Sequence, residues 1–158
     1  TYPLMCDIRV ASESARIGFV FNRIGMLPEL GSHSLLPRIV GFSNAAQLLM
    51  GGEIIDAQTA LSMGLVSAVH PDDQLLDQAI ELATQLCAAA PVSVAATKQL
   101  LWKGLSLSWE EMHRMETPVF DWVAQQPDSV EGVTAFLEKR PPNWLMDPSE
   151  DLPKELFD

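Results

Sequence analysis

The sequence predicts an α/β fold in which a short front part of strands and helices precedes a long part made of helices alone. Two segments near the start, residues 7–11 and 16–20, are short and rich in β-branched residues, as strands are. From residue 72 on, apolar residues recur every three or four positions, which is the period of an amphipathic helix. With 158 residues, 47% of them hydrophobic, the chain is long enough to bury a core.

The first helix is expected after the two strands, from about residue 31. Gly31 and Ser32 are suited to its start, and Gly41 to its end. Its apolar face would consist of Leu35, Leu36, Ile39 and Val40.

Two further helices and a strand are expected to complete the front part. Ser43 would begin the second helix, and the glycines at 51–52 would end it. Its apolar face would consist of Ala46, Leu49 and Met50. Asp56 would begin a third, short helix that Gly64 ends, and residues 65–69 predict a strand.

Four helices are expected between residues 71 and 142. Each begins at residues that favour a helix N-terminus: Asp72 or Asp73, Pro91, the capping box Ser108 to Glu111, and the segment Asp128 to Glu131. Prolines 141 and 142 would end the last one. The acidic, proline-rich residues 143–158 then predict an extended tail. The tail either lies along a surface through its apolar residues, such as Trp144, or is a frayed terminus.

Composition narrows the classes of function. The formal net charge of −11 argues against a nucleic-acid partner, because duplex binding requires clustered Lys and Arg. The apolar runs are shorter than the ~20 residues that span a bilayer, so no membrane segment is expected. Cys6 and Cys87 lie far apart without metal-ligand spacing, and are expected to be reduced, buried thiols in a cytoplasmic compartment.

Glu29 is the candidate proton-transfer residue. It lies in Asn22 to Ser32, NRIGMLPELGS, among mostly apolar neighbours. An isolated acid in such a setting is either a proton-transfer group or, here, an acid that complements the dipole of the following helix. The histidines His33, His70 and His113 have no convergent Asp, Ser or Cys in the sequence, so neither a metal site nor a triad is expected.

Five blocks of the sequence together resemble the crotonase superfamily, the enoyl-CoA hydratase and isomerase fold. They are CDIRVASESARIGF, the Gly-x-x-Pro-acid-x-Gly segment around Glu29, LLPRIVG, GGEIIDAQTALSMGLVSAV and GVTAFLEKRPP. The resemblance extends to about Pro142 and implies the C-terminal portion of a crotonase-like ββα superhelix, followed by a helical oligomerisation region. Residues 1–70 would hold the core and the active-site segment, residues 71–142 the helical trimerisation region, and residues 143–158 the tail.

The resemblance also implies chemistry on an acyl-CoA thioester, whose carbonyl oxygen accepts two backbone N–H bonds. Hydratases of the family use two glutamates, and their positions fall on Thr1 and Phe21, neither of which is an acid. Isomerases that move a double bond from Δ3 to Δ2 need one base, which matches Glu29. The resemblance therefore favours an isomerase with Glu29 as base. The alternatives are a diverged hydratase or lyase of the same fold and a catalytically silent protein that binds acyl-CoA.

Further residues would bind the substrate. Phe21, Ile24, Leu27 and Gly31 surround Glu29 in the sequence, and the apolar ones either wall the acyl pocket or belong to an ordinary core. Phe136 and Lys139 match the aromatic residue and the lysine that reach the acyl-CoA of a neighbouring subunit. Alternatively, Lys139 complements a helix dipole.

The resemblance completes the expected setting of the enzyme. Coenzyme A enters as part of the substrate, and no metal or redox cofactor is expected. The partners would be the missing N-terminal half of the same protein, which holds the oxyanion donors, and further copies in a homotrimer or hexamer. The cytoplasm is the expected location, or a mitochondrion or peroxisome in a eukaryote.

Overall fold

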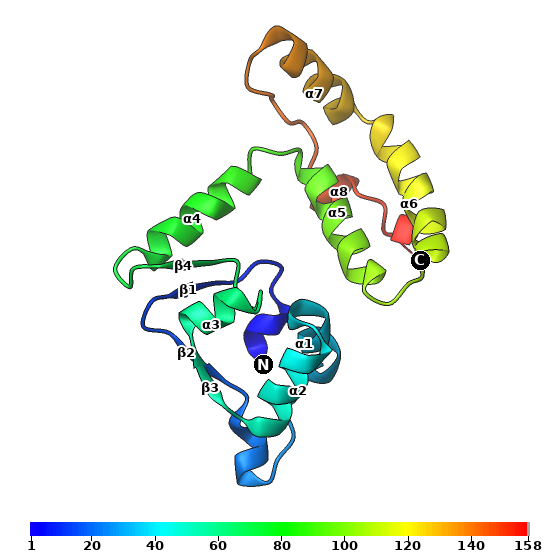
Figure 1. The fold of residues 1–158 in the computed structure, drawn as a ribbon. Coiled ribbons are helices and arrows are strands. Elements are labelled where there is room, and N and C mark those ends of the chain that lie inside the picture. The colour runs from blue at the N-terminus through cyan, green and yellow to red at the C-terminus, as the bar shows by residue number, and fades with distance from the viewer. Residues whose placement is uncertain (158) are drawn as a thin grey trace. The chain divides into compact units, whose positions relative to one another are not determined.

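The computed structural model describes residues 1–157, which divide into two compact units. The N-terminal unit comprises Thr1–Leu82, drawn in blue to green in Figure 1, and the C-terminal unit begins at Ala83. The division falls within the helix α4 (Leu75–Leu86).

The N-terminal unit combines two small sheets with short helices. Before α4, its elements in chain order are the 3-10 helix η1 (Tyr2–Met5), β1 (Val10–Ser12), β2 (Arg16–Gly18), the 3-10 helix η2 (Val20–Ile24), α1 (Ser32–Val40), α2 (Phe42–Gly51), β3 (Ile54–Asp56), α3 (Ala57–Ser62) and β4 (Ala68–His70).

The two sheets have different topologies. Strand β1 pairs in parallel with β4, with Val10 opposite Ala68, whereas β2 pairs antiparallel with β3, with Arg16 opposite Asp56. A parallel pair requires a long crossover connection, and α1, α2 and α3 all lie within it. The three expected front helices are therefore confirmed.

The expected strands are confirmed with shifted bounds. The segment 16–20 forms a strand only to Gly18, because Val20 already begins η2. The strand expected at 65–69 lies at 68–70, because the amides of Leu65 and Val66 bond the Ala60 carbonyl at the end of α3. Strand β3 was not expected, since it has three residues and runs directly into α3.

The hydrophobic core of this unit lies between the sheets and the first two helices. Leu36, Leu48 and Leu65 are fully buried. The expected apolar face of α2 is wrong by one position, because Leu48 lies inside and Met50 outside. The sequence offers two apolar stripes on this helix, and packing against α1 selects the one formed by Ala45, Leu48 and Leu49.

The expected cap of α4 is also wrong. The helix begins at Leu75, and the carboxylate of Asp72 accepts a hydrogen bond from the Ser14 amide at 3.1 Å instead. This bond, from an amide to an anionic acceptor, lowers the pKa of Asp72.

The C-terminal unit consists of helices and a folded tail. Its elements after α4 are α5 (Pro91–Gly104), α6 (Trp109–Ala124), α7 (Pro127–Glu138), α8 (Pro148–Asp151) and the 3-10 helix η3 (Lys154–Phe157). Pro91 does begin α5, and the capping box at α6 is confirmed by reciprocal bonds between Ser108 and Glu111.

The tail folds back onto the helices. Phe157 is only 2% exposed and packs in one core cluster with Ala96 of α5 and Val119 of α6. The frayed alternative is therefore wrong up to residue 157, and the expected contact with a surface is confirmed. The tail is not extended throughout, however, because it forms α8 and η3. Asp128 does not cap α7 as expected, because its buried carboxylate accepts the Leu145 amide at 2.7 Å and so holds the tail.

Two further features concern the whole described chain. Cys6 and Cys87 are unpaired, as expected, but exposed rather than buried. Among residues 1–157 no single helix is long and apolar enough to cross a membrane; α4 and α5 reach that length and composition only when they are counted together across a break.

Candidate functional site

The candidate active-site segment, residues 20–31, is anchored to the end of α2. The Asn22 side-chain amide donates to the Leu49 carbonyl at 2.7 Å, and Arg23 Nε donates to the Gly51 carbonyl at 3.4 Å. Gly25 ends η2 in the left-handed region with φ 74°, which glycine adopts without strain. Side chains of η2 thus fix this end of the segment to the C-terminal end of α2.

The other end of the segment is fixed by backbone conformation. Leu30 and Gly31 both have positive φ, 55° and 71°, so the chain makes a left-handed turn into α1. For leucine this conformation is strained by about 1–2 kcal/mol. The Glu29 carbonyl accepts the Ser32 amide at 3.1 Å, which places Glu29 directly before the first turn of α1.

The Glu29 side chain is exposed and has no hydrogen-bond partner among the described residues. It does not cap α1 with its carboxylate, since the N-cap is Gly31 and no side chain caps this helix. Its apolar neighbours do not enclose it in this unit, because Ile24 is 70% and Leu27 74% exposed. Phe21 is half-buried. The expected apolar wall is therefore not formed by the N-terminal unit alone.

One polar group near Glu29 was not singled out from the sequence. Ser32 is fully buried, and its hydroxyl has no partner among the described residues. An unsatisfied buried hydroxyl costs about 1–3 kcal/mol. The only sequence signal was its position after Gly31, which indicated a helix start and not a buried polar group.

The second group of predicted binding residues lies at the end of α7 in the C-terminal unit. Phe136 is 82% exposed, and Lys139 is exposed with φ 56°. Arg140 next to it donates two hydrogen bonds to the Glu131 carboxylate, at 2.6 and 2.9 Å, and one to Glu138 at 2.7 Å. Glu29 and its neighbours thus belong to one unit, and Phe136 and Lys139 to the other.

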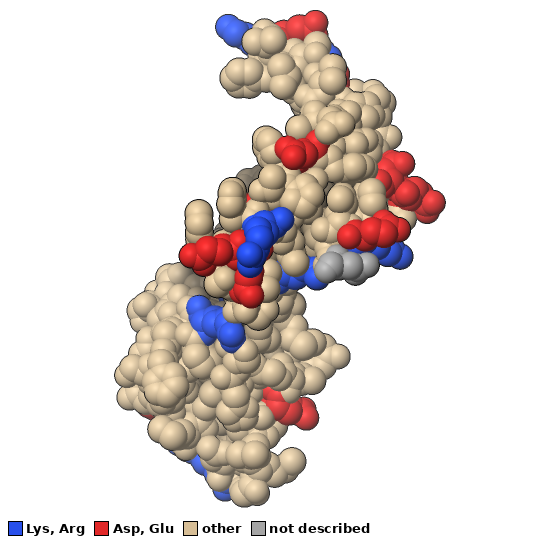
Figure 2. All heavy atoms as spheres, turned by 90° about the vertical axis from the view of Figure 1, so that its right-hand side faces the viewer, with Lys and Arg blue, Asp and Glu red and all other residues tan. Residues whose placement is uncertain are grey.

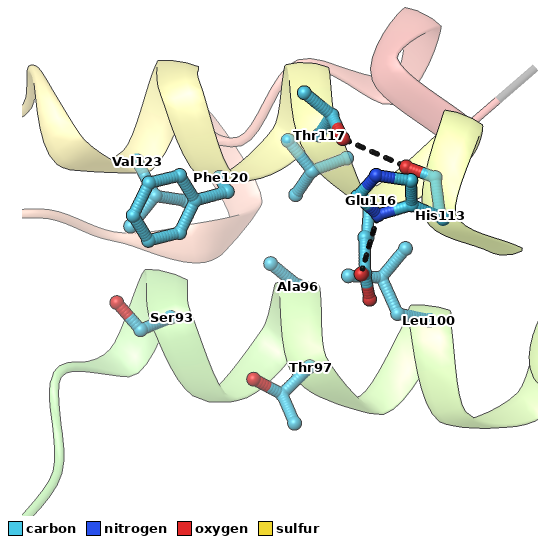
Figure 3. A pocket seen from close by; sticks show the side chains of 10 residues that line it. Ser93, Ala96, Thr97, Leu100, His113, Glu116, Thr117, Phe120 and Val123 are labelled. Atoms are coloured by element: carbon cyan, nitrogen blue, oxygen red, sulfur yellow. Dashed lines mark hydrogen bonds and ion pairs between the residues drawn. The ribbon is translucent and has the colours of Figure 1, made fainter.

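One cavity in each unit is lined by other residues. In the N-terminal unit a cavity of about 490 Å³ lies beside β1, and Phe19 is its only lining residue from the vicinity of the active-site segment. In the C-terminal unit a cavity of about 500 Å³ lies between α5 and α6 (Figure 3). Its walls are mostly apolar, and His113, which pairs with Glu116 at 3.4 Å, lies at one end.

Charge and metal-ligating groups add no further site. On the face that Figure 2 shows, basic side chains are scattered among acidic and uncharged ones. No cluster of three or more His, Cys, Asp or Glu side chains with metal-binding geometry occurs among residues 1–157.

Comparison with known proteins identifies the family. The family model described as enoyl-CoA hydratase/isomerase matches residues 2–147. The chain belongs to this family.

Curated members of the enoyl-CoA hydratase/isomerase family align with most of the chain. The 2,3-dehydroadipyl-CoA hydratase of Escherichia coli is 37% identical over 141 residues, which cover 89% of this chain and 55% of the relative. The mitochondrial methylglutaconyl-CoA hydratase of Mus musculus is 32% identical over 145 residues, covering 89% and 46%. The chain thus spans about half the length of the curated relatives it matches.

Solved structures of the family confirm the fold. An enoyl-CoA hydratase from Bacillus anthracis superposes with a TM-score of 0.87 at 34% identity, over 89% of this chain and 55% of the other. A probable enoyl-CoA hydratase/isomerase from Mycobacterium abscessus gives 0.87 at 35% identity, over 91% and 57%. The predicted crotonase-like α/β fold is therefore correct.

Proposed function

We propose that the protein processes acyl-CoA thioesters and adds water to the double bond of a 2-enoyl-CoA. The observation that carries this proposal is the set of relatives, because those at 32–37% identity over 89% of the chain are named hydratases. These names support hydration better than the isomerase activity that the resemblance favoured.

Glu29 is the proposed proton-transfer group. Its carboxylate accepts a proton from water as the water oxygen bonds to C3, and the same proton is delivered to C2 of the resulting enolate. The enolate oxygen requires two N–H donors, and one such donor contributes about 2.7–4 kcal/mol in the transition state. We place these donors outside residues 1–157.

Isomerisation of a 3-enoyl-CoA is the second candidate. It is supported by Thr1 and Phe21, which occupy the two positions where the resemblance expects the hydratase glutamates. With one carboxylate, Glu29 would remove a proton from C2 and return it to C4. Isomerisation moves only a proton, and hydration adds water without any change in net oxidation state, so neither proposed reaction needs a redox cofactor, and we propose none and no metal.

The proposed coenzyme A contacts lie at the end of α7. Phe136 and Lys139 are exposed, as residues that meet a ligand of another subunit must be. We propose that they contact the coenzyme A of a neighbouring copy in a homotrimer or hexamer, with the lysine ammonium on a phosphate.

The experiment compares Glu29→Gln with Glu53→Gln, which removes an exposed carboxylate from the same unit. With a 2-enoyl-CoA in D₂O, the wild type is expected to form 3-hydroxyacyl-CoA with deuterium at C2. Glu29→Gln is expected to lower kcat by about 10²–10⁴-fold, and Glu53→Gln to leave it unchanged.

Each alternative has its own outcome. Double-bond migration in a 3-enoyl-CoA without hydration would establish the isomerase. Coenzyme A binding without any turnover would establish a silent binding protein. Full hydratase activity of Glu29→Gln would overturn the role of Glu29.

A further inference from the structure

The turn that follows α7 is held in an unusual backbone conformation. Lys139 lies in the left-handed region, where glycine is the usual residue, and the Arg140 amide bonds back to the Ala135 carbonyl at 3.1 Å. A left-handed lysine is disfavoured by about 1–2 kcal/mol, so the surrounding contacts must maintain it.

Glu131 and Arg140 supply such a contact across the end of the helix. The guanidinium forms a bidentate pair with Glu131, which lies nine residues earlier on α7. The same Glu131 carboxylate also accepts the Asn143 amide at 2.6 Å. One carboxylate on α7 therefore binds the chain at two points after Lys139, the Arg140 side chain and the Asn143 amide.

The two adjacent cations of this turn have different surroundings. Arg140 is engaged by two carboxylates, since Glu138 accepts a further bond from its Nε at 2.7 Å. Lys139 has no carboxylate partner among the described residues. Of the pair, Lys139 is thus the cation with free capacity for an anionic ligand, while the donors of Arg140 are directed to the protein.

We infer that Glu131 and Arg140 are positioning residues, which hold the turn so that Lys139 presents its ammonium to a phosphate of coenzyme A. This inference rests on the proposed function of Lys139. The planar fork of arginine matches a carboxylate at two points, so the pair fixes an orientation that a single charge does not fix.

The test measures KM and kcat of the complete enzyme with two substrates. One is the enoyl-CoA, and the other is the N-acetylcysteamine thioester of the same acyl group, which lacks the nucleotide phosphates. Lys139→Ala is expected to raise KM for the CoA thioester roughly tenfold, the loss of one charge-assisted bond, and to leave the short thioester unaffected. Glu131→Gln and Arg140→Lys are expected to raise the same KM about threefold without changing kcat, because each weakens the bidentate geometry.

Glu138→Gln is the matched control. It removes the carboxylate that Arg140 Nε binds, but it leaves the two hydrogen bonds between Arg140 and Glu131 and the bond from the Asn143 amide. The KM of this variant is therefore expected to equal that of the wild type. An unchanged KM in Glu131→Gln beside a raised KM in Lys139→Ala would overturn the positioning role and leave the proposed coenzyme A contact intact. An equal rise in Glu131→Gln and Glu138→Gln would also overturn it, because local charge alone would then explain the effect. An unchanged KM in Lys139→Ala would refute the coenzyme A contact itself and the positioning role with it.

Discussion

Substitution of Gly31 by alanine isolates the backbone requirement of the turn that carries Glu29. At φ 71° an added Cβ meets only Leu35 Cδ1, at 3.9 Å, which is ordinary van der Waals contact. The cost is therefore conformational, about 1–2 kcal/mol for a left-handed alanine. Alanine also lowers the conformational entropy of the unfolded chain, which stabilises the protein by about 0.4–1 kcal/mol. The free energy of unfolding is therefore expected to fall by roughly 1 kcal/mol in total.

Gly51→Ala is the matched control for this substitution. Gly51 is the last residue of α2, has no positive φ, and an added Cβ meets nothing within 4 Å. Alanine is favoured over glycine in a helix by up to about 1 kcal/mol, so this variant is expected to be equally or more stable than the wild type.

Urea denaturation measures both free energies of unfolding. We expect Gly31→Ala to lie about 1–2 kcal/mol below Gly51→Ala, with Gly31→Asn between them because asparagine tolerates the left-handed region. Equal free energies for the two alanine variants would refute the argument, since the turn would then not require positive φ. Because the Ser32 amide bonds the Glu29 carbonyl, Gly31→Ala is also expected to lower kcat.

Two further predictions concern the C-terminal unit. Phe157→Ala removes a ring from the core and is expected to lower the free energy of unfolding by about 3–5 kcal/mol in urea denaturation. Leu145→Ala, at a side chain that is 67% exposed, is the control and is expected to change this free energy by less than about 0.5 kcal/mol. Similar losses in the two variants would show that the tail is not part of the core. The hydrogen bonds from Arg140, and then from the Asn143 amide, lower the pKa of Glu131 from 4.5 to about 2. Because the pKa of Glu131 is lower in the folded than in the unfolded protein, its ionised carboxylate stabilises the fold above pH 4.5, and this contribution is lost as the pH falls toward 2. The free energy of unfolding is therefore expected to fall less steeply with decreasing pH in Glu131→Gln than in the wild type. An unchanged slope would contradict this prediction.

The parts of the fold that could be predicted depend on contacts between near neighbours in the sequence. Asp56 caps α3 by accepting the Thr59 amide at 2.8 Å, three residues away, and Ser108 and Glu111 form a box over the same spacing. These bonds form wherever the segment is helical, so residue type and spacing predict them. The bond at Asp56 also lowers its pKa.

The wrong assignments involve the same residue types with distant partners. Asp72 and Asp128 were expected to cap helices, but they accept amides 58 and 17 residues away, from Ser14 and Leu145. An aspartate before a helical pattern is a suitable cap, yet nothing in the local sequence reveals a competing amide that the tertiary fold brings nearer. Helix propensity therefore predicted where these helices lie, whereas the tertiary fold determined which amides the two carboxylates accept.

The candidate site shows the same limit for apolar residues. The segment around Glu29 is apolar in sequence, but Ile24 and Leu27 expose most of their surface in this unit, so sequence hydrophobicity did not imply a buried carboxylate. Full burial of one such side chain contributes about 1.5–3 kcal/mol of stabilisation, which the exposed Ile24 and Leu27 do not provide in this unit. An acyl chain bound over these residues would bury them, and the same contact would exclude water from Glu29. The exposure that contradicts a ready-made apolar pocket is therefore compatible with a proton-transfer site whose dry environment is completed by the substrate.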